Sequence, residues 1–183
     1  MDRKERRVLL VRHCEVEECY REVCYGRADV GLSEYGRNRS RDLARQLETF
    51  SIAQVWHSNL SRTRFLVEAL AALARVRAIA CPLLRERDFG AWELRPWQEI
   101  YAETGDAMLG MIREPAVWRP PEGETTFEMR DRVLAWFRAL PSSGAIVAVT
   151  HGGPIAILRG VLAGRPVSEW PGLIPATGSV VEL

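Results

Sequence analysis

The sequence predicts a three-layer α/β/α sandwich around a mostly parallel sheet. Two short β-rich runs, residues 8–11 and 146–149, are apolar at every position, which is typical of strands buried on both faces of a parallel sheet. Helical spacing of apolar residues lies between these runs, so strands and helices alternate along the chain. The 183 residues are close to the usual size of one domain, and we expect a single domain over residues 1–183.

The first half of the chain contains signals for two helices and two further strands. Ser33 can cap a helix over residues 33–47, because its hydroxyl can accept a hydrogen bond from a free backbone N–H. A short strand is expected over residues 55–56 and a helix over residues 60–73. A third strand is expected over residues 76–80.

The second half contains two helix signals and a terminal strand. Thr125 and Glu128 have the spacing of a capping box, and the apolar stripe that follows predicts a helix up to residue 140. Pro154 suits the first turn of another helix. The chain is expected to end in a strand over residues 179–183. The proline-rich residues 114–124 favour an irregular loop, which is part of a candidate lid around residues 92–124.

The composition is that of an ordinary globular protein, with 47% hydrophobic and 27% charged residues. Twenty-five basic residues balance 24 acidic ones, which leaves no overall field to attract nucleic acid or a membrane surface. No apolar run approaches the ~20 residues that cross a bilayer, and no signal peptide is evident. We therefore expect a cytoplasmic protein with reduced cysteines that binds neither nucleic acid nor membranes, in an oligomeric state that the sequence leaves open.

Two histidines are expected at the same edge of the sheet. Arg12 and His13 follow the first apolar run, and His151 and Gly152 follow the second. Ligands bind beyond the carboxyl ends of the strands in such sheets, so these groups should converge. Gly152 also begins a helix, whose free N–H groups attract anions. Arg62 lies in the first turn of its helix and can reach the same edge to bind phosphate bidentately.

Each of these residues alone has a common structural explanation. A histidine at a strand end is usually a hydrogen-bonded structural residue, and we assign that role to His57. An arginine in a helix is usually solvated. The joint placement of Arg12, His13, Arg62 and His151 is what favours an anion site.

Five motifs contain or flank these residues and span almost the whole chain. They occupy residues 10–13, 26–33, 58–63, 86–93 and 150–153. Together they resemble the motifs of the histidine phosphatase (phosphoglycerate mutase-like) superfamily. This resemblance implies the phosphoglycerate mutase-like fold and an enzyme that uses neither a metal ion nor a cofactor.

The resemblance also implies a phosphoryl-transfer mechanism. His13 would be the nucleophile, since a neutral imidazole can attack phosphorus and form a phosphohistidine that water then hydrolyses. Glu86 would donate a proton to the leaving alkoxide, and burial and a nearby phosphate dianion both disfavour its charged form. Composition alone would instead favour an exposed, self-paired charge run over residues 85–88.

Further residues are expected to hold the substrate. By resemblance, the phosphate pocket consists of Arg12, Arg62, Gly152 and His151, the last of which is also expected to take part in catalysis. Neighbouring residues are expected to contact the rest of the substrate, namely Tyr25, Gly26 and Arg27. The expected partner is a small-molecule phosphomonoester.

One position departs from the family pattern. Cys14 stands where the commonest signature has glycine, which argues against a direct transfer of mutase function. Residues 12–15 and 24–29 look more like the α-ribazole-5′-phosphate phosphatase branch, which implies a place in cobalamin biosynthesis. A phosphoglycerate mutase-type isomerase is the main alternative, and the short chain with its compact candidate lid favours a phosphatase over it.

Two alternatives come from other classes of protein. A metal or redox module would use His13, Cys14, Cys19 and Cys24, but their spacing is not a usual zinc or iron–sulfur pattern. A non-catalytic phospholigand-binding protein would not need His13 and Glu86, and both residues are present.

Overall fold

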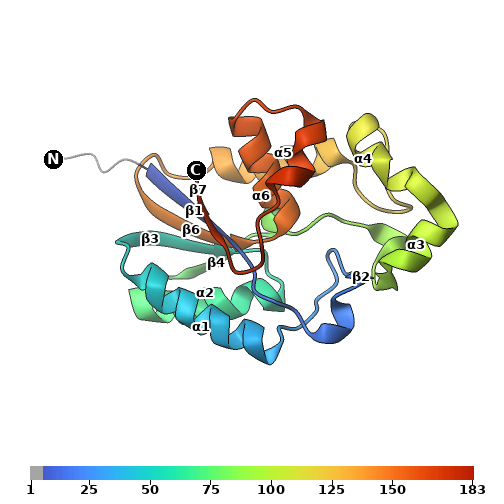
Figure 1. Ribbon diagram of the computed structural model, residues 1–183. Helices are drawn as coiled ribbons and strands as arrows, with labels where there is room; N and C mark the ends of the chain where they lie inside the picture. The colour runs from blue at the N-terminus through green and yellow to red at the C-terminus, as the bar shows by residue number, and fades with distance from the viewer. Residues whose placement is uncertain (1–5) are drawn as a thin grey trace.

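A computed structural model describes residues 6–183 and contains a five-stranded central sheet (Figure 1). The strands are ordered β4-β3-β6-β1-β7. The first four pair in parallel, and the edge strand β7 pairs with β1 in the antiparallel direction. The strands are β1 (Arg6–Arg12), β3 (Ile52–His57), β4 (Ala78–Ala80), β6 (Gly144–Thr150) and β7 (Val180–Glu182). The predicted mostly parallel sheet is therefore confirmed.

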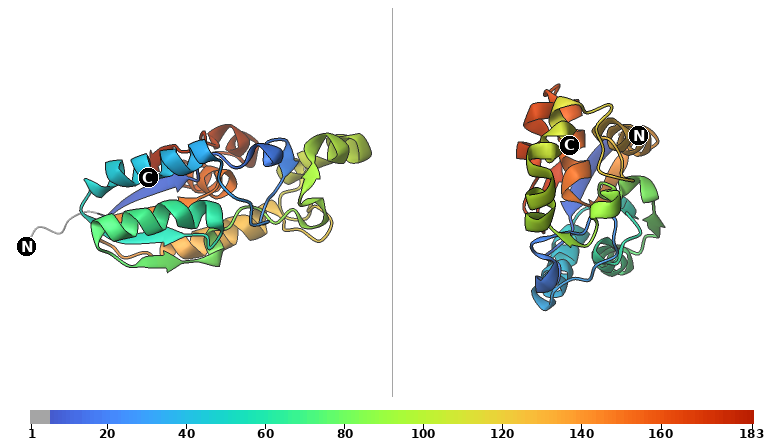
Figure 2. Two further views of the ribbon diagram at one scale, coloured as in Figure 1. Left: turned by 90° about the horizontal axis from the view of Figure 1, so that it is seen from below. Right: turned by 90° about the vertical axis from the view of Figure 1, so that its right-hand side faces the viewer.

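Helices cover both faces of this sheet. Figures 1 and 2 show α1 and α2 on one side and α5 and α6 on the other. These helices are α1 (Glu34–Glu48), α2 (Ser61–Ala74), α5 (Thr126–Arg138) and α6 (Gly152–Leu162). The three-layer α/β/α architecture that the sequence predicts is therefore confirmed.

The two inner strands explain why their sequences are continuously apolar. Successive side chains of a strand point to opposite faces, so β1 contributes to two separate cores. Leu9 and Val11 pack in the core that includes Leu43 of α1 and Leu66 of α2. Val8 and Leu10 pack in the other core, with residues of α5 and α6. Both faces of β1 are therefore buried, as in other parallel sheets.

The helix signals are confirmed, and some boundaries differ by a few residues. The Ser33 hydroxyl accepts a hydrogen bond from the backbone N–H of Gly36, and Thr125 and Glu128 form the reciprocal bonds of a capping box. The expected strand over residues 76–80 begins only at Ala78, because Arg75 in left-handed conformation first ends α2. The terminal strand comprises Val180–Glu182.

The segment expected as a lid is largely helical. It begins at the end of η3 (Gly90–Trp92) and contains α3 (Trp97–Thr104), η4 (Gly105–Leu109) and α4 (Gly110–Arg113). Residues 114–125 contain no helix or strand, in agreement with the expected loop. A small two-stranded sheet of β2 (Val23–Cys24) and β5 (Arg95–Pro96) joins this segment to the N-terminal half. Figure 1 shows α3 and α4 beyond the end of the sheet at which β1 and β6 finish.

The remaining elements are short 3₁₀ helices. They are η1 (Glu18–Tyr20), η2 (Pro82–Leu84) and η5 (Val167–Leu173). Over residues 6–183, no helix has the length and apolar character needed to span a bilayer.

Candidate active site

The pairing of β1 with β6 brings two histidines together. In the parallel register Arg12 lies opposite Thr150, so the residues that follow, His13 and His151, become neighbours. Their ring centroids are 5.1 Å apart, and both side chains are buried. The structure thus joins two residues that are far apart in the sequence, as the strand pattern predicts.

The His13 ring is fixed in one tautomer. Its Nδ1 lies 2.8 Å from the carbonyl oxygen of Cys14. A carbonyl only accepts hydrogen bonds, so Nδ1 carries the proton and Nε2 of the neutral ring has a free lone pair. Burial, and next the positive charge of Arg62, lower the pKa of His13 to about 3. The ring is therefore neutral at physiological pH and suited to nucleophilic attack through Nε2.

A chain of hydrogen bonds fixes the opposite tautomer in His151. The Thr63 hydroxyl donates to the carbonyl of Leu60 (2.8 Å), so its oxygen accepts from Ser58 Oγ at 2.9 Å. Ser58 Oγ in turn accepts from Nε2 of His151 at 2.8 Å. The proton of the neutral ring is thereby on Nε2, and Nδ1 is bare. Burial and the nearby Arg62 hold the pKa of His151 well below its usual value.

Two arginines complete the cluster. Arg12 Nη1 donates to the carbonyl of Pro175 at 2.7 Å. Arg62 is fully buried and donates to two carbonyls, from Nη2 to Gly26 at 2.6 Å and from Nη1 to Ala28 at 2.7 Å. Each terminal nitrogen of Arg62 thus uses one N–H for a backbone carbonyl, which leaves a second N–H on each and the Nε–H. The bidentate phosphate contact stays a prediction.

Unpartnered nitrogens concentrate in this cluster. Within residues 6–183, four buried side-chain polar atoms have no hydrogen-bond partner, and three of them are Arg12 Nε, Arg62 Nε and His151 Nδ1. Buried polar atoms are nearly always hydrogen-bonded, so such a concentration needs an explanation. Two guanidinium groups and an imidazole side by side fit an anion with several acceptor oxygens, such as phosphate.

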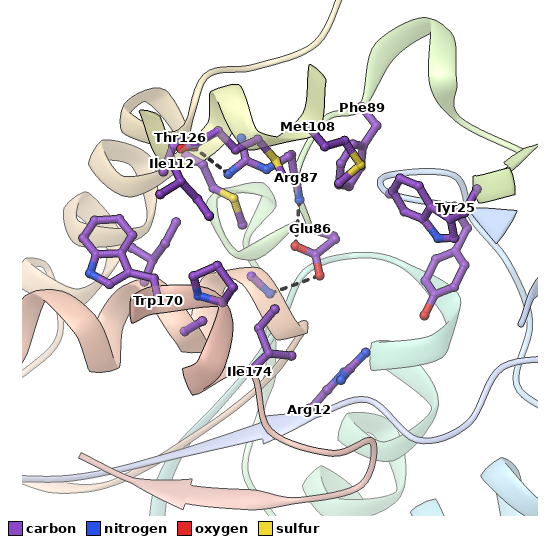
Figure 3. A pocket seen from close by; sticks show the side chains of 18 of the residues that line it. Arg12, Tyr25, Glu86, Arg87, Phe89, Met108, Ile112, Thr126, Trp170 and Ile174 are labelled. Atoms are coloured by element: carbon purple, nitrogen blue, oxygen red, sulfur yellow. Dashed lines mark hydrogen bonds between the residues drawn. The ribbon is translucent and has the colours of Figure 1, made fainter. Parts of the chain in front are cut away.

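Glu86 lies beside the start of α6. Its two carboxyl oxygens accept hydrogen bonds from the backbone N–H groups of Arg87 at 2.9 Å and Gly153 at 3.2 Å (Figure 3). A side chain at position 153 would collide with the Glu86 carboxyl group and with Met129. At position 152 a Cβ would lie 2.9 Å from Ile174 and 3.4 Å from the Arg12 guanidinium. Both glycines therefore let the helix start approach the site closely.

A cavity of about 400 Å³ opens beside these groups. Arg12, Tyr25, Glu86 and Gly153 contribute to its wall, as does Gly26. Figure 3 shows Arg12 and Glu86 directed into the same space, with apolar side chains around them. The apolar side chains come mainly from the segment of residues 97–112 and from α6 and η5, and no chemical motif in the sequence identifies them.

The structure places Arg27 differently from its two neighbours. Its guanidinium is paired with Asp88 at 2.7 Å and Glu124 at 2.9 Å, and it is not among the residues that line the cavity. Arg27 therefore does not face the cavity that Tyr25 and Gly26 line, and its contact with the substrate stays a prediction. Glu124 also pairs with Arg132, so Arg27 is part of an ionic network that ties three chain segments together.

The cysteines do not gather into a binding site. Cys14 and Cys24 are buried, whereas Cys19 is exposed. In the part of the chain that the structure describes, no three histidine, cysteine or acidic side chains are placed to share a metal ion. The geometry gives no support to the metal-module alternative.

Comparison with known proteins identifies the family. A model of the histidine phosphatase superfamily, branch 1, matches residues 8–183. The chain belongs to this superfamily. It is accordingly a metal-independent phosphoric monoester hydrolase.

Several known proteins are similar over most of the chain. A glucosyl-3-phosphoglycerate phosphatase of Mycolicibacterium vanbaalenii is 30% identical over 176 residues, which cover 91% of this chain and 78% of the relative. A probable phosphoglycerate mutase GpmB of Photorhabdus laumondii is 30% identical over 162 residues and covers 87% and 75%, respectively.

Solved structures of known proteins share the fold. A mycobacterial glucosyl-3-phosphoglycerate phosphatase superimposes with a TM-score of 0.84 at 27% identity and covers 98% of this chain and 90% of its own. The α-ribazole phosphatase from Shigella flexneri gives a TM-score of 0.80 at 22% identity, with coverage of 96% and 89%, which concerns the fold alone.

The buried neutral histidines predict a stability that falls in acid. His13 takes up its proton near pH 6.5 when unfolded but only near pH 3 when folded. Between these values the unfolded chain holds more protons, so the free energy of unfolding decreases as the pH is lowered, by up to about 1.4 kcal/mol per pH unit for each such histidine. Urea denaturation of the protein and of His13→Gln at several pH values should show a shallower dependence in the variant. The two curves should run parallel above pH 7, and equal slopes in acid would contradict the assignment.

The bare Nδ1 of His151 predicts that anion binding is coupled to proton uptake. An unprotonated nitrogen cannot donate to an oxyanion, so Nδ1 should take up a proton when phosphate binds. Calorimetric titration with inorganic phosphate at pH 8, in two buffers that differ in ionisation enthalpy, measures this uptake. We expect it to be lost in His151→Gln and retained in Glu86→Gln. Heats that do not depend on the buffer would refute the coupling.

Proposed function

We propose that the protein hydrolyses phosphomonoesters through a phosphohistidine on Nε2 of His13. The observation that carries this proposal is the buried cluster in which His13 Nε2 has a free lone pair beside three unpartnered nitrogens of Arg12, Arg62 and His151. The two arginine nitrogens, and His151 Nδ1 once it has taken up a proton, supply charge and hydrogen bonds for the equatorial oxygens of the transferring phosphoryl group. Stabilisation of those oxygens is where phosphoryl-transfer catalysis mostly lies.

The first step transfers the phosphoryl group to the enzyme. The lone pair of His13 Nε2 forms a bond to phosphorus, while the bond from phosphorus to the ester oxygen breaks. Protonated Glu86 gives its proton to that oxygen, which leaves as the alcohol. Glu86 is suited to this role because it lines the same cavity as Arg12.

The second step releases phosphate. Water attacks the phosphorus of the phosphohistidine and the P–N bond breaks, which returns the electron pair to His13. Glu86, now a carboxylate, accepts the proton of the attacking water and is ready for the next turnover. Tyr25 supports both steps indirectly, because its ring lies 5.0 Å from the Arg62 guanidinium and stacks against that charge.

Two phosphomonoesters are candidate substrates. The motifs around Cys14 and Cys24 resemble the α-ribazole-5′-phosphate phosphatase branch, and that substrate would imply a role in cobalamin biosynthesis. A relative that is 30% identical is named for glucosyl-3-phosphoglycerate. We favour α-ribazole-5′-phosphate, because its aromatic base matches a mostly apolar cavity better than a sugar that carries a carboxylate does.

The alternative of a mutase is tested with the same reaction. Incubation of the protein with phosphomonoesters, including 3-phosphoglycerate and α-ribazole-5′-phosphate, should release free phosphate in step with loss of substrate. Acid quench within the first turnover should trap label on histidine, and His13→Ala should abolish both label and turnover while leaving the circular dichroism spectrum unchanged. Isomerised product without phosphate release would instead support a mutase.

Glu86→Gln should affect substrates according to their leaving groups. A general acid contributes about 10²–10⁴-fold when the leaving group is a poor one, so kcat for alkyl phosphates should fall by that factor. Aryl phosphates, whose phenolate leaves without help, should lose less than about tenfold. Equal losses for 4-nitrophenyl phosphate and an alkyl phosphate would argue against the acid role.

A further inference from the structure

The cavity has one polar end and two apolar walls. Arg12, Tyr25 and Glu86 lie at the polar end. One wall comes from residues 97–112 and includes Trp97, Met108 and Ile112, and the other comes from α6 and η5 and includes Ile157 and Trp170. Figure 3 shows Met108 and Ile112 on one side of Glu86 and Trp170 and Ile174 further round the same space.

The polar side chains within these walls already have partners. Arg87 is buried and donates to the carbonyl of Glu124 at 3.2 Å and to the hydroxyl of Thr126 at 3.1 Å. Thr126 uses its own proton in a hydrogen bond to the carbonyl of Met111. The charge of Arg87 already interacts with the nearby carboxylates of Glu124 and Glu86, so a substrate carboxylate at these walls would face two acidic groups. A buried charge without its own partner is strongly disfavoured.

Arg21 is the other cation in the cavity lining. Its side chain is 58% exposed and faces two carboxylates, Glu15 at 3.5 Å and Glu18 at 3.8 Å. An exposed arginine with two acidic neighbours attracts a further anion weakly, because water and those carboxylates already screen its charge. The strong positive charge of the cavity is therefore confined to the phosphate end.

Methionine is concentrated in this cavity. The chain has four methionines, and three of them, Met108, Met111 and Met129, line it. Methionine side chains are unbranched and polarisable, so they adapt to apolar groups of different shape. A wall of this kind favours broad specificity for apolar ligands and does not recognise one hydrogen-bonding pattern.

We propose that the alcohol released by this enzyme carries a bulky, apolar and uncharged group, and that residues 97–112 together with η5 select that group. The proposal rests on the proposed function, since it concerns the leaving group of the same reaction. The phosphoryl group binds at the histidine pair, and the apolar part of the ester lies between Ile112 and Trp170. Esters that carry a carboxylate next to the phosphate are discriminated against, because their charge would be buried without a partner.

The test uses esters whose leaving groups have similar acidity, so that differences in kcat/KM report on binding and not on leaving-group reactivity. Ethyl, butyl, hexyl and benzyl phosphate are compared with glycerol phosphate and 3-phosphoglycerate. Burial of each methylene should raise kcat/KM about fourfold until the cavity is filled. We expect 3-phosphoglycerate to be at least about 100-fold poorer than butyl phosphate, as an unpaired buried carboxylate requires. A flat series, or a preference for the hydroxylated or charged ester, would overturn the proposal.

Substitutions in the wall formed by residues 97–112 test whether this wall determines the selectivity among esters. Ile112→Gln and Met108→Gln should lower kcat/KM for hexyl phosphate about tenfold or more, mainly by raising KM. The value of kcat/KM for ethyl phosphate should stay nearly unchanged, because the short chain buries little apolar surface against the wall. Val117→Gln is the matched control, because Val117 follows α4, is 74% exposed and does not line the cavity. Equal losses for the long and short esters would mean that the wall does not select.

The outcomes separate this proposal from the one on which it depends. If no ester, short or long, releases phosphate, the proposed phosphatase function fails and the selectivity fails with it. If ethyl and hexyl phosphate are hydrolysed at equal efficiency, the phosphatase function stands and only the assignment of an apolar leaving group is wrong.

Discussion

The site depends on two uncharged imidazoles buried next to two guanidinium groups. Burial and the field of Arg62 lower the pKa of both His13 and His151, so neither ring holds a second proton at neutral pH. A protonated His13 would have no lone pair for phosphorus. The same arginines that attract phosphate therefore also keep the nucleophile in its reactive form, and this link joins anion binding to catalysis without a metal ion.

The fold stabilises these buried cations with backbone carbonyls from distant segments. Arg62 binds the carbonyls of Gly26 and Ala28, and Arg12 binds that of Pro175. A buried charge without such partners would be strongly destabilising. The loop after β2 and the segment before β7 must thus both be in place before the site exists, which makes the geometry of the anion site a property of the completed fold.

Patterning and chain order could predict the sheet, the four helices that cover it and the histidine pair. Each of these depends on local signals or on the rule that parallel strands end together. Arg62 shows the limit of that reasoning. Its place at the start of α2 predicts its direction, but not the carbonyls that bind its terminal nitrogens. Arg27 shows it again, since its pairing with Asp88 and Glu124 joins segments whose proximity no sequence spacing reveals. The helical content of residues 97–113 was equally hidden, because short helices packed on one another lack a long periodic signal.

Family membership determines how the phosphate is bound but does not determine which alcohol is esterified to it. The physics of these two kinds of recognition explains the difference. Phosphate is bound by directional, charge-assisted hydrogen bonds, which require particular residues at particular positions and so produce motifs. The cavity wall acts through apolar burial, which is non-directional and depends on area and volume. Met108, Met111 and Ile112 could be exchanged for other apolar residues of similar size without leaving a recognisable pattern. Relatives named for different substrates are therefore expected among proteins with one phosphate site, and the walls of each cavity must be examined to identify its ester.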